Sequence, residues 1–342
     1  MAEEVSPDLA ARLRAELYTI LDGGPTELDE LRETAVTRLG DRHQTCFLIA
    51  AKCERAHSGH RPAHWSLEAW TELLASARNV LAPLDPVLME IVSARNRWLG
   101  RRAEPGDPDE AVRSQAAELR NRETGLRSDD HWTGVARLDL AAALVERARL
   151  TRVAGDGGPP PEADLGQAYG LADQEVTRRA RLHGDDHLFT WRAREMRGAA
   201  LVGLAAHGAD SPIRHDQAMN VAEMTLSFVT GRRAHSDSHL MGVWLLRAEA
   251  LLLAGMFPAG ERAGRKAVAL AAVRPGDWSG GVAPGGPWLA LAAALAGRGD
   301  LGGARLAAGR AVRERNRWFP VGSLYRAEAR CRLDSLEDRT GG

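Results

Sequence analysis

The sequence predicts an all-α protein built as a solenoid of stacked helix pairs. Hydrophobic residues recur with helical spacing over segments of about 12 to 20 residues, and short breaks rich in Gly, Pro and Asp separate these segments. Alternating runs of Val, Ile, Thr and aromatic residues, which would indicate strands, are nearly absent. An internal repeat then indicates how many residues each helix pair contains.

The clearest internal repeat relates residues 242–270 to residues 286–314 at a spacing of 44 residues. The matched positions are Trp244 with Trp288, Ala248 with Ala292, Leu251 with Leu295, Gly255 with Gly299, Gly260 with Ala304, and Ala267 with Ala311. The large residues form the apolar stripe of a first helix, and the glycines stand where that helix must end. The small residues let a second, antiparallel helix approach closely.

A recurring linker explains the segment HGDDH at residues 183–187, which resembles a metal site at first sight. Similar segments precede other helix starts, and their marker positions are His43, Asp85, His131, His187 and His239. Asp and Ser in these segments suit the N-terminus of a helix, because their side chains accept hydrogen bonds from free backbone N–H groups. We therefore interpret HGDDH, with the pairs Asp129–Asp130 and Asp185–Asp186, as helix caps rather than as ligands or catalytic acids.

This pattern resembles the tetratricopeptide repeat, and the linkers resemble those of its kinesin-light-chain-like subclass. The resemblance implies a right-handed superhelix of about seven antiparallel helix pairs followed by a C-terminal capping helix. Nearly all positive charge is arginine, with Lys52 and Lys266 as the lysines, which is typical of a GC-rich genome and favours a bacterial source.

The anchors place seven helix pairs and a capping helix near 321–336. The pairs are 6–22/26–39, 43–57/64–81, 86–101/108–124, 131–153/163–182, 187–206/213–232, 239–254/258–272 and 286–297/301–316. We expect a degenerate N-terminal pair over 1–40, the repeat array over 41–318, and the capping helix with a disordered tail over 319–342. The Pro/Gly-rich segments 154–164 and 274–287 are expected to be loops inside the array.

Composition narrows the classes of function. The net charge of −1 gives no support for bulk binding of nucleic acid, which requires a basic surface. Three cysteines make no disulfide framework, and no apolar segment has the length of a membrane span or a secretory signal. We therefore expect a cytoplasmic protein with no nucleic-acid or membrane partner.

Chemistry-bearing motifs are sparse. The densest group of metal-ligand residue types is Cys53, His57, His60 and His64, with Cys46 nearby. Zinc accepts such ligands, but the cysteines fall where the repeat requires buried apolar residues, and the histidines lie toward a loop. The Gly-rich segments do not match a phosphate-binding loop, and there is no GxSxG motif. We expect no cofactor and no catalysis.

The resemblance implies that first helices line a concave groove for a partner peptide or helix. Projecting the repeat gives these groove candidates: Asn96, Arg97, Asp139, Arg194, Arg197 and Glu249. Arginines there could hold a partner carboxylate in two hydrogen bonds, or could simply keep the face soluble. Most of the arginines in the clusters at 95–102, 178–183 and 313–318 are interpreted as solvated helix faces or as side-chain stems that cover apolar surface.

The C-terminal pairs present an apolar face instead, formed by Leu245, Leu246, Leu252, Leu253, Ala293 and Ala296. It could contact the capping helix, a second copy of the chain in a homodimer, or an apolar segment of a partner. The sequence thus favours a non-enzymatic scaffold that binds a protein or peptide. The alternatives are a regulator that senses a ligand through a change of curvature, an enzyme on a helical scaffold, and a metal sensor.

Overall fold

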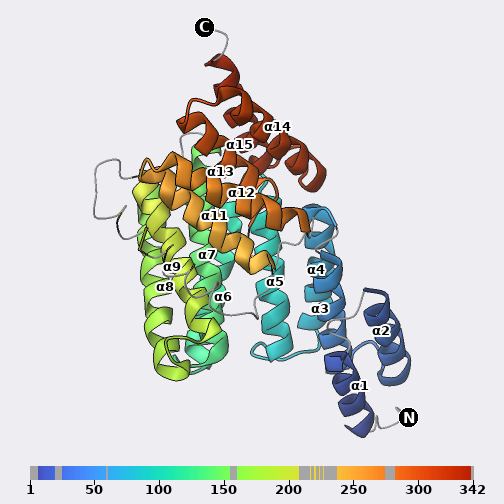
Figure 1. Cartoon of the computed structure of the whole chain (residues 1–342). Helices are drawn as coiled ribbons and strands as arrows, with labels where there is room; N and C mark the ends of the chain where they lie inside the picture. Colours follow the sequence, from blue (N-terminus) through green and yellow to red (C-terminus); the bar gives the residue numbers. More distant parts are fainter. Residues whose placement is uncertain are drawn as a thin grey trace. The chain divides into compact units, whose positions relative to one another are not determined.

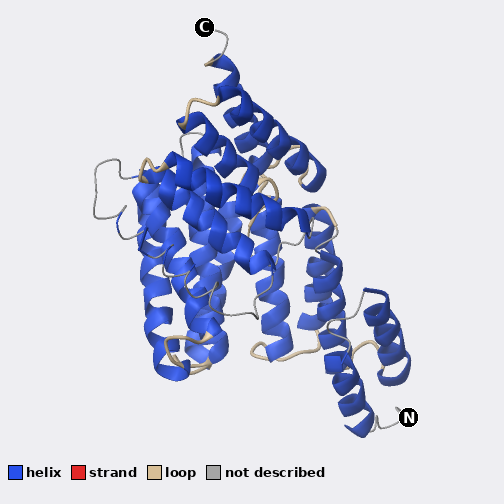
Figure 2. Cartoon of the chain, viewed as in Figure 1, coloured by secondary structure: helices blue, strands red, loops and turns tan. Residues whose placement is uncertain are grey.

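The structure is a computed structural model of the chain. It describes residues 7–19, 25–58, 61–154, 160–207, 237–273 and 282–339, and positions 216, 219, 220, 223 and 226 between them. Within these residues all regular structure is helical (Figure 2). The predicted helix 213–232 lies mostly outside the described residues, as do residues 155–159 of the predicted loop 154–164 and residues 274–281 of the predicted loop 274–287.

Contacts divide the chain into two compact units, residues 1–99 and 100–342. Unit 1 contains α1 (Pro7–Thr19), α2 (Pro25–Leu39), α3 (Gln44–Ser58), α4 (Ala63–Arg78) and most of α5 (Pro86–Arg102) (Figure 1). Unit 2 contains the remaining helices: α6 (Asp107–Gly125), α7 (His131–Ala154), α8 (Pro161–His183), α9 (Leu188–His207), α11 (Asp237–Leu253), α12 (Phe257–Val273), α13 (Gly286–Gly297), α14 (Leu301–Trp318) and α15 (Leu324–Asp338). The prediction of a solenoid of sequential helix pairs is confirmed, and the domain boundaries at 40 and 318 stay predictions.

Five helices of unit 2 form a closed ring of contacts. Helices that follow each other in sequence pack together, and the first helices of successive pairs also touch: α7 with α9, α9 with α11, α11 with α13, and α13 with α15. Helix α15 in turn packs against α7. We call α7, α9, α11, α13 and α15 the five-helix ring.

The 44-residue register predicted for the C-terminal pairs is borne out by the contacts. Gly255 and Gly299 both adopt positive φ, of 70° and 82°, which is the backbone conformation that favours glycine. The cation of Lys266 lies 5.4 Å from the ring centre of Trp244, and Arg310 lies 4.8 Å from that of Trp288. Because Lys266 and Arg310 are themselves 44 residues apart, the repeat extends to the contact between the two helices of each pair.

The linkers cap the helices that follow them. The Nδ1 atoms of His43 and His187 accept hydrogen bonds from the N–H groups two residues later, at 3.1 and 3.2 Å. Asp85 and Asp130 accept in the same way, at 2.8 and 2.7 Å. The third linker therefore uses Asp130 where the sequence pattern pointed to His131, because the aspartate one residue earlier occupies the capping position.

Three second helices of unit 2, α6, α8 and α14, are each tied to the next first helix by a buried arginine. Eight residues before the capping position stand Arg122, Arg179 and Arg315, which are 0%, 5% and 0% exposed. Arg122 donates to the carbonyl of Trp132 and Arg179 to that of Phe189, both at 2.9 Å, and Arg315 donates to that of Tyr325. Each guanidinium also lies over the aromatic ring of its partner, at 5.7, 5.8 and 5.4 Å from the centre.

These contacts correct the interpretation of the clusters 178–183 and 313–318 as solvated faces. Arg178, Arg179 and Arg315 are buried, because the linker carbonyls need donors and the guanidinium is long enough to reach them. In unit 1 the same positions hold Ala35 and Ala77, both fully buried.

A carboxylate neutralises several of these arginines at once. Glu175 is 0% exposed and accepts from Arg178, Arg179 and Arg137 at 3.0, 3.0 and 3.1 Å. Burial raises the pKa of Glu175, but the hydrogen bonds and charges of the three arginines outweigh it, so that the net pKa is lowered. The carboxylate thus remains ionised inside the protein.

We expect Glu175→Gln to destabilise unit 2 by about 3 kcal/mol, because it leaves the buried Arg178 and Arg179 without their counter-ion, whereas Arg137 keeps a second carboxylate, Glu123. Glu162→Gln is the matched control, since Glu162 is exposed on the same helix, and it should change stability by less than about 0.5 kcal/mol. Urea denaturation monitored by circular dichroism measures both. Equal stabilities for the two variants would contradict the assigned network.

The repeat register makes a second prediction. Ala292 lies on α13 and is fully buried against the neighbouring helices. Ala292→Trp should therefore overpack the α13–α14 pair and lower the free energy of unfolding by about 1–3 kcal/mol. Leu306→Trp on α14 is the control, because Leu306 is 74% exposed and a larger side chain there has room. A thermal melt of Ala292→Trp that coincides with that of the control would show the register to be wrong.

Candidate functional site

Six polar or charged residues from four helices gather in unit 2, and we call them the ring cluster. They are Glu146 and Arg149 of α7, Glu249 of α11, Arg315 of α14, and Tyr325 and Glu328 of α15. Helix α11 packs against α9 and α13, which separate it from α7 and α15 along the ring. The cluster therefore draws its residues from three helices of the five-helix ring, α7, α11 and α15, and from α14.

Arg149 joins the two ends of unit 2. Its Nη1 atom donates to both carboxylate oxygens of Glu328, at 2.9 and 2.8 Å, across a separation of 179 residues. Its Nη2 and Nε atoms donate to Glu146 of its own helix, at 2.6 and 3.2 Å. The guanidinium also lies 5.0 Å from the ring centre of Tyr325. Arg149 therefore fastens α15 to α7 through its contacts with Glu328 and Tyr325.

Arg315 supports the same carboxylate from the other side. Its Nη1 atom lies 2.6 Å from Glu328, and its Nε atom donates to the carbonyl of Pro284 at 3.2 Å. Burial raises the pKa of Glu328, but the charges of Arg149 and Arg315 outweigh it and the net pKa is lowered. Glu328 is consequently ionised and held between two cations.

Glu249 differs from the other members of the ring cluster. Its half-buried carboxyl makes no hydrogen bond to any residue that the structure describes. Burial raises its pKa to about 7; the charge of Arg149 opposes this rise, and those of Glu328 and Glu146 add to it. Glu146 and Glu328 already balance Arg149 and Arg315, so an ionised Glu249 gives the cluster one negative charge in excess.

The other groove candidates are not among the residues of this cluster. Arg194 pairs with the carboxylate and carbonyl of Asp185 in the preceding linker, and Arg197 lies 2.7 Å from Asp173 of α8. Asp139 is buried on α7. Asn96 and Arg97 belong to unit 1, where Asn96 is buried and accepts from Arg95 at 3.2 Å. The role of these five residues and of Glu249 in binding a partner stays a prediction.

The candidate metal ligands are used in other contacts. Cys53 donates to the carbonyl of Leu28 at 3.2 Å, and burial raises its pKa to about 11. His57 lies 2.9 Å from Asp29, and His64 packs its ring against Trp65, whereas His60 lies outside the described residues. Within the described ranges, no three His, Cys, Asp or Glu side chains are grouped so that they could hold a metal ion.

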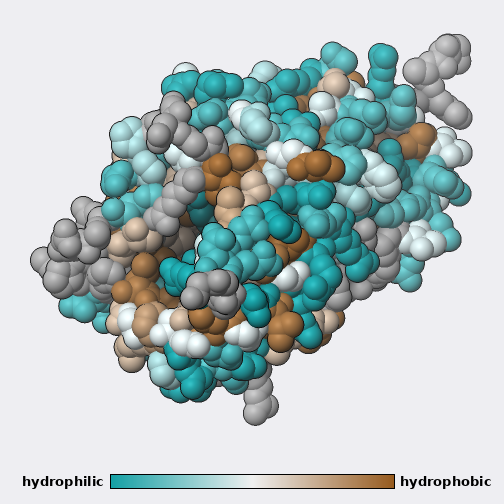
Figure 3. Space-filling model, turned by 90° about the horizontal axis from the view of Figure 1, so that it is seen from above, coloured by the Kyte–Doolittle hydropathy of each residue, from teal (hydrophilic) through white to brown (hydrophobic). Residues whose placement is uncertain are grey.

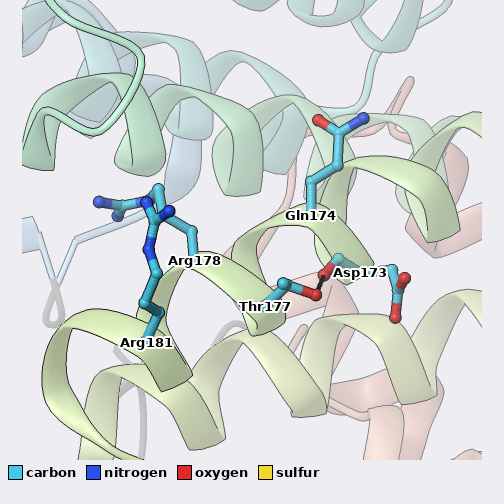
Figure 4. Close-up of a pocket in the computed structure, with 5 residues that line it drawn as sticks. All are labelled: Asp173, Gln174, Thr177, Arg178 and Arg181. Atoms are coloured by element: carbon cyan, nitrogen blue, oxygen red, sulfur yellow. Dashed lines mark hydrogen bonds between the residues drawn. The ribbon is translucent and has the colours of Figure 1, made fainter.

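Two shallow depressions lie elsewhere on unit 2. One, of about 340 Å³, is lined by Asp173, Gln174, Thr177, Arg178 and Arg181, all on α8 (Figure 4). Figure 4 shows Asp173 and the two arginines at opposite ends of this stretch, with the Thr177 hydroxyl bonded to the Asp173 carbonyl. The other, of about 230 Å³, lies between α14 and α15. Neither brings together a set of groups with an evident chemistry.

The surface gives no stronger candidate. The face seen in Figure 3 is mostly hydrophilic, with smaller hydrophobic patches between the polar residues. Exposed large hydrophobic residues are spread over several elements, for example Tyr18 on α1, Trp65 on α4 and Leu306 on α14. Among the described residues, no helix is long and apolar enough to cross a membrane.

Sequence reasoning found Glu249 but missed its surroundings. Arg149, Glu328 and Arg315 meet only because α15 packs against α7, a contact that no local pattern announces. One signal was present in the sequence: an arginine followed ten residues later by an aromatic residue, as in Arg122 with Trp132 and Arg315 with Tyr325. That spacing would have placed Arg315 and Tyr325 in a buried junction.

Comparison with known proteins agrees with this architecture. No model of a protein family and no curated protein sequence matches the chain. A tetratricopeptide repeat protein from Parabacteroides merdae is similar over 96% of this chain and 98% of its own, with 10% identity and a TM-score of 0.51. BtubC from P. vanneervenii matches 76% of this chain and 91% of its own, with 17% identity and a TM-score of 0.46. Kinesin light chain TPR-like repeats from Podosopora anserina match 66% and 92%, with 14% identity and a TM-score of 0.43.

The first of these likenesses shows the fold and nothing finer. The kinesin-light-chain-like subclass and the bacterial source stay predictions. The chain has the all-α, TPR-like solenoid architecture.

Proposed function

We propose that unit 2 is a non-catalytic module that binds a partner polypeptide, and that a cationic side chain of the partner contacts Glu249. The observation that carries this proposal is the carboxyl of Glu249, which has no hydrogen-bond partner among the described residues and remains half-buried on the five-helix ring. A lysine or arginine of the partner would supply that hydrogen bond and cancel the excess negative charge.

The internal repeat supports a specific role for this residue. The position that matches Glu249 in the next repeat, 44 residues later, is Ala293. Helix α13 packs in the same register with alanine there, so the solenoid does not require a carboxylate at this position. A carboxyl that costs energy to bury and that packing does not require is better explained by binding.

Apolar side chains beside Glu249 would contribute to affinity. Leu245, Leu252 and Leu253 of α11 and Ala293 and Ala296 of α13 are half-buried, whereas Leu246 packs fully in the core. Half-buried leucines lose their remaining water contact when a partner covers them, which contributes roughly 25 cal/mol per Å² of area. The partner we propose is thus a peptide or helix with one basic residue next to apolar ones.

General acid catalysis is the alternative role for Glu249, because a general acid needs a pKa near 7. We favour binding because half-buried leucines of α11 stand one turn from Glu249 on either side and would add apolar contact with a partner. The ligand-sensing regulator becomes one use of the same module.

Selection of a random peptide library on the purified full chain tests this proposal. We expect enriched peptides to carry Lys or Arg next to apolar residues. Glu249→Gln should weaken their binding about 10- to 100-fold in calorimetric titration, because a charge-assisted hydrogen bond contributes about 1.5–3 kcal/mol. Glu162→Gln, which removes an exposed carboxylate of α8, should leave the dissociation constant unchanged. Peptides that bind Glu249→Gln as tightly as the natural chain would overturn the assignment of the site.

A further inference from the structure

We propose that the depression between α14 and α15 binds an acidic segment of a partner polypeptide, which places one apolar side chain in it and carboxylates on the arginines beside it. We call this depression the α14–α15 groove. Among the residues that line it are Leu306, Gly309 and Arg313 of α14 and Leu333 and Glu337 of α15. The groove contains no residue of the ring cluster, so this proposal does not rest on the function proposed for Glu249.

The exposed face of α14 carries positive charge that the described residues do not neutralise. The helix has five arginines and one carboxylate, Glu314, which accepts hydrogen bonds from the start of α13 at 3.1 and 3.2 Å. Arg315 is buried and pairs with Glu328 of α15. Three exposed arginines make no ion pair with any residue that the structure describes: Arg310, Arg313 and Arg317. Cations in excess on a surface favour a partner that carries carboxylates.

Spacing along α14 places an apolar residue and two of these cations on one face of the helix. Leu306, Arg313 and Arg317 follow one another at intervals of seven and four residues, which are close to whole turns of an α-helix. Leu306 is 74% exposed, and the half-buried Leu333 of α15 lines the same groove. One apolar side chain of a partner can therefore cover both leucines, while two carboxylates one helical turn apart reach the arginines.

Gly309 leaves the groove open at the middle of α14. Glycine inside a helix is less favourable than alanine, so its presence there needs a reason. Packing within the described residues does not supply one, because an added Cβ would meet only the guanidinium of Arg313, at an ordinary contact distance of 3.8 Å. A side chain at this position would instead occupy the groove. The glycine is explained by the space that a partner's apolar side chain requires.

An acidic polypeptide fits this groove better than a nucleic acid or an anionic membrane does. A phosphate backbone has no apolar side chain to cover Leu306 and Leu333, and the carboxylate of Glu337 in the lining repels it. A helix that lies on a membrane needs a broad apolar face, whereas Leu306 is the one large hydrophobic residue that α14 exposes. A polypeptide supplies apolar and acidic side chains together.

Selection of a random peptide library on the purified full chain, followed by calorimetric titration, tests the groove. We expect a class of peptides with net negative charge, in which Asp or Glu residues one helical turn apart stand near a large apolar residue. Arg313→Glu should weaken their binding about 10- to 30-fold, because the reversal replaces an attraction by a repulsion of similar size. Arg120→Glu, which reverses an exposed arginine of α6, should leave the dissociation constant unchanged.

A variant that fills the groove separates binding from stability. Gly309→Leu should abolish binding of the acidic peptides and keep or raise the melting temperature, because leucine favours the helix and meets no close neighbour. Gly166→Leu is the matched control, since Gly166 is an exposed glycine of α8 whose Cβ would also have open space. It should keep both the fold and the binding of the natural chain.

Several results would overturn the groove as a site for an acidic polypeptide. One is the absence of an acidic class of peptides, and another is an acidic class that binds Arg313→Glu and Gly309→Leu as tightly as the natural chain. Binding of duplex DNA or of phosphatidylserine–phosphatidylcholine vesicles that is lost in Arg313→Glu would assign the surface to phosphate groups instead. A dimer in sedimentation that is lost in Gly309→Leu would assign it to a second copy of the chain. Acidic peptides should bind Glu249→Gln normally and basic peptides should bind Gly309→Leu normally, so the two proposals fail separately.

Discussion

The buried arginine at three helix junctions, α6–α7, α8–α9 and α14–α15, is the interaction on which unit 2 depends. A solenoid must turn its chain after every helix, and each turn leaves carbonyl groups that need donors once the next pair covers them. Arg122, Arg179 and Arg315 reach from the end of one helix to the start of the next and donate to these carbonyls. The same guanidinium covers the aromatic ring at the junction, so one side chain satisfies the backbone and fills the core.

Burying these cations creates the charge requirement that shapes the rest of the unit. Each guanidinium needs a carboxylate, which Glu118 and Glu175 supply in the first two junctions and Glu328 in the third. Replacing a buried ion pair by apolar residues often leaves stability unchanged, and unit 1 follows that route with Ala35 and Ala77. The pairs in unit 2 therefore contribute the specific geometry of the junctions more than the free energy of folding.

The ring cluster is the third junction with added residues. Arg315 and Tyr325 stand at the positions that Arg122 and Trp132 occupy in the first junction, so the repeat fixes their placement. Because α15 also packs against α7, the junction carboxylate Glu328 accepts hydrogen bonds from a further cation, Arg149, and its charge adds to the raised pKa of Glu249 on α11. The arginine–aromatic junction recurs along the chain, and at α14–α15 it is also the place where α15 packs against α7.

Sequence reasoning succeeded where the signal is local and periodic. Helical spacing and the turn glycines predicted the pairs, and the 44-residue match predicted the partners of Trp244 and Trp288. It misplaced one cap by a residue, since Asp130 and His131 are both able to accept the hydrogen bond and only the backbone geometry selects between them. Sequence reasoning predicted that Arg179 and Arg315 are solvated. In a sequence with so many arginines, composition gives no signal that distinguishes the few buried ones.

The groove candidates predicted from the repeat differ in whether their charge is neutralised by a neighbouring side chain, and side-chain length explains the difference. Arg194 and Arg197 have long side chains that reach carboxylates on the neighbouring linker and helix, so their charges are already neutralised. The carboxyl of Glu249 lies on a shorter side chain and finds only Arg149, which Glu146 and Glu328 already hold. The repeat places Ala293 at the matched position, whereas it retains a cation over the tryptophan in both copies. The residues that are the same in repeats 242–270 and 286–314 are explained by helix packing. Glu249 is present in the first repeat and replaced by Ala293 in the second, and helix packing provides no hydrogen-bond partner for its carboxyl among the described residues.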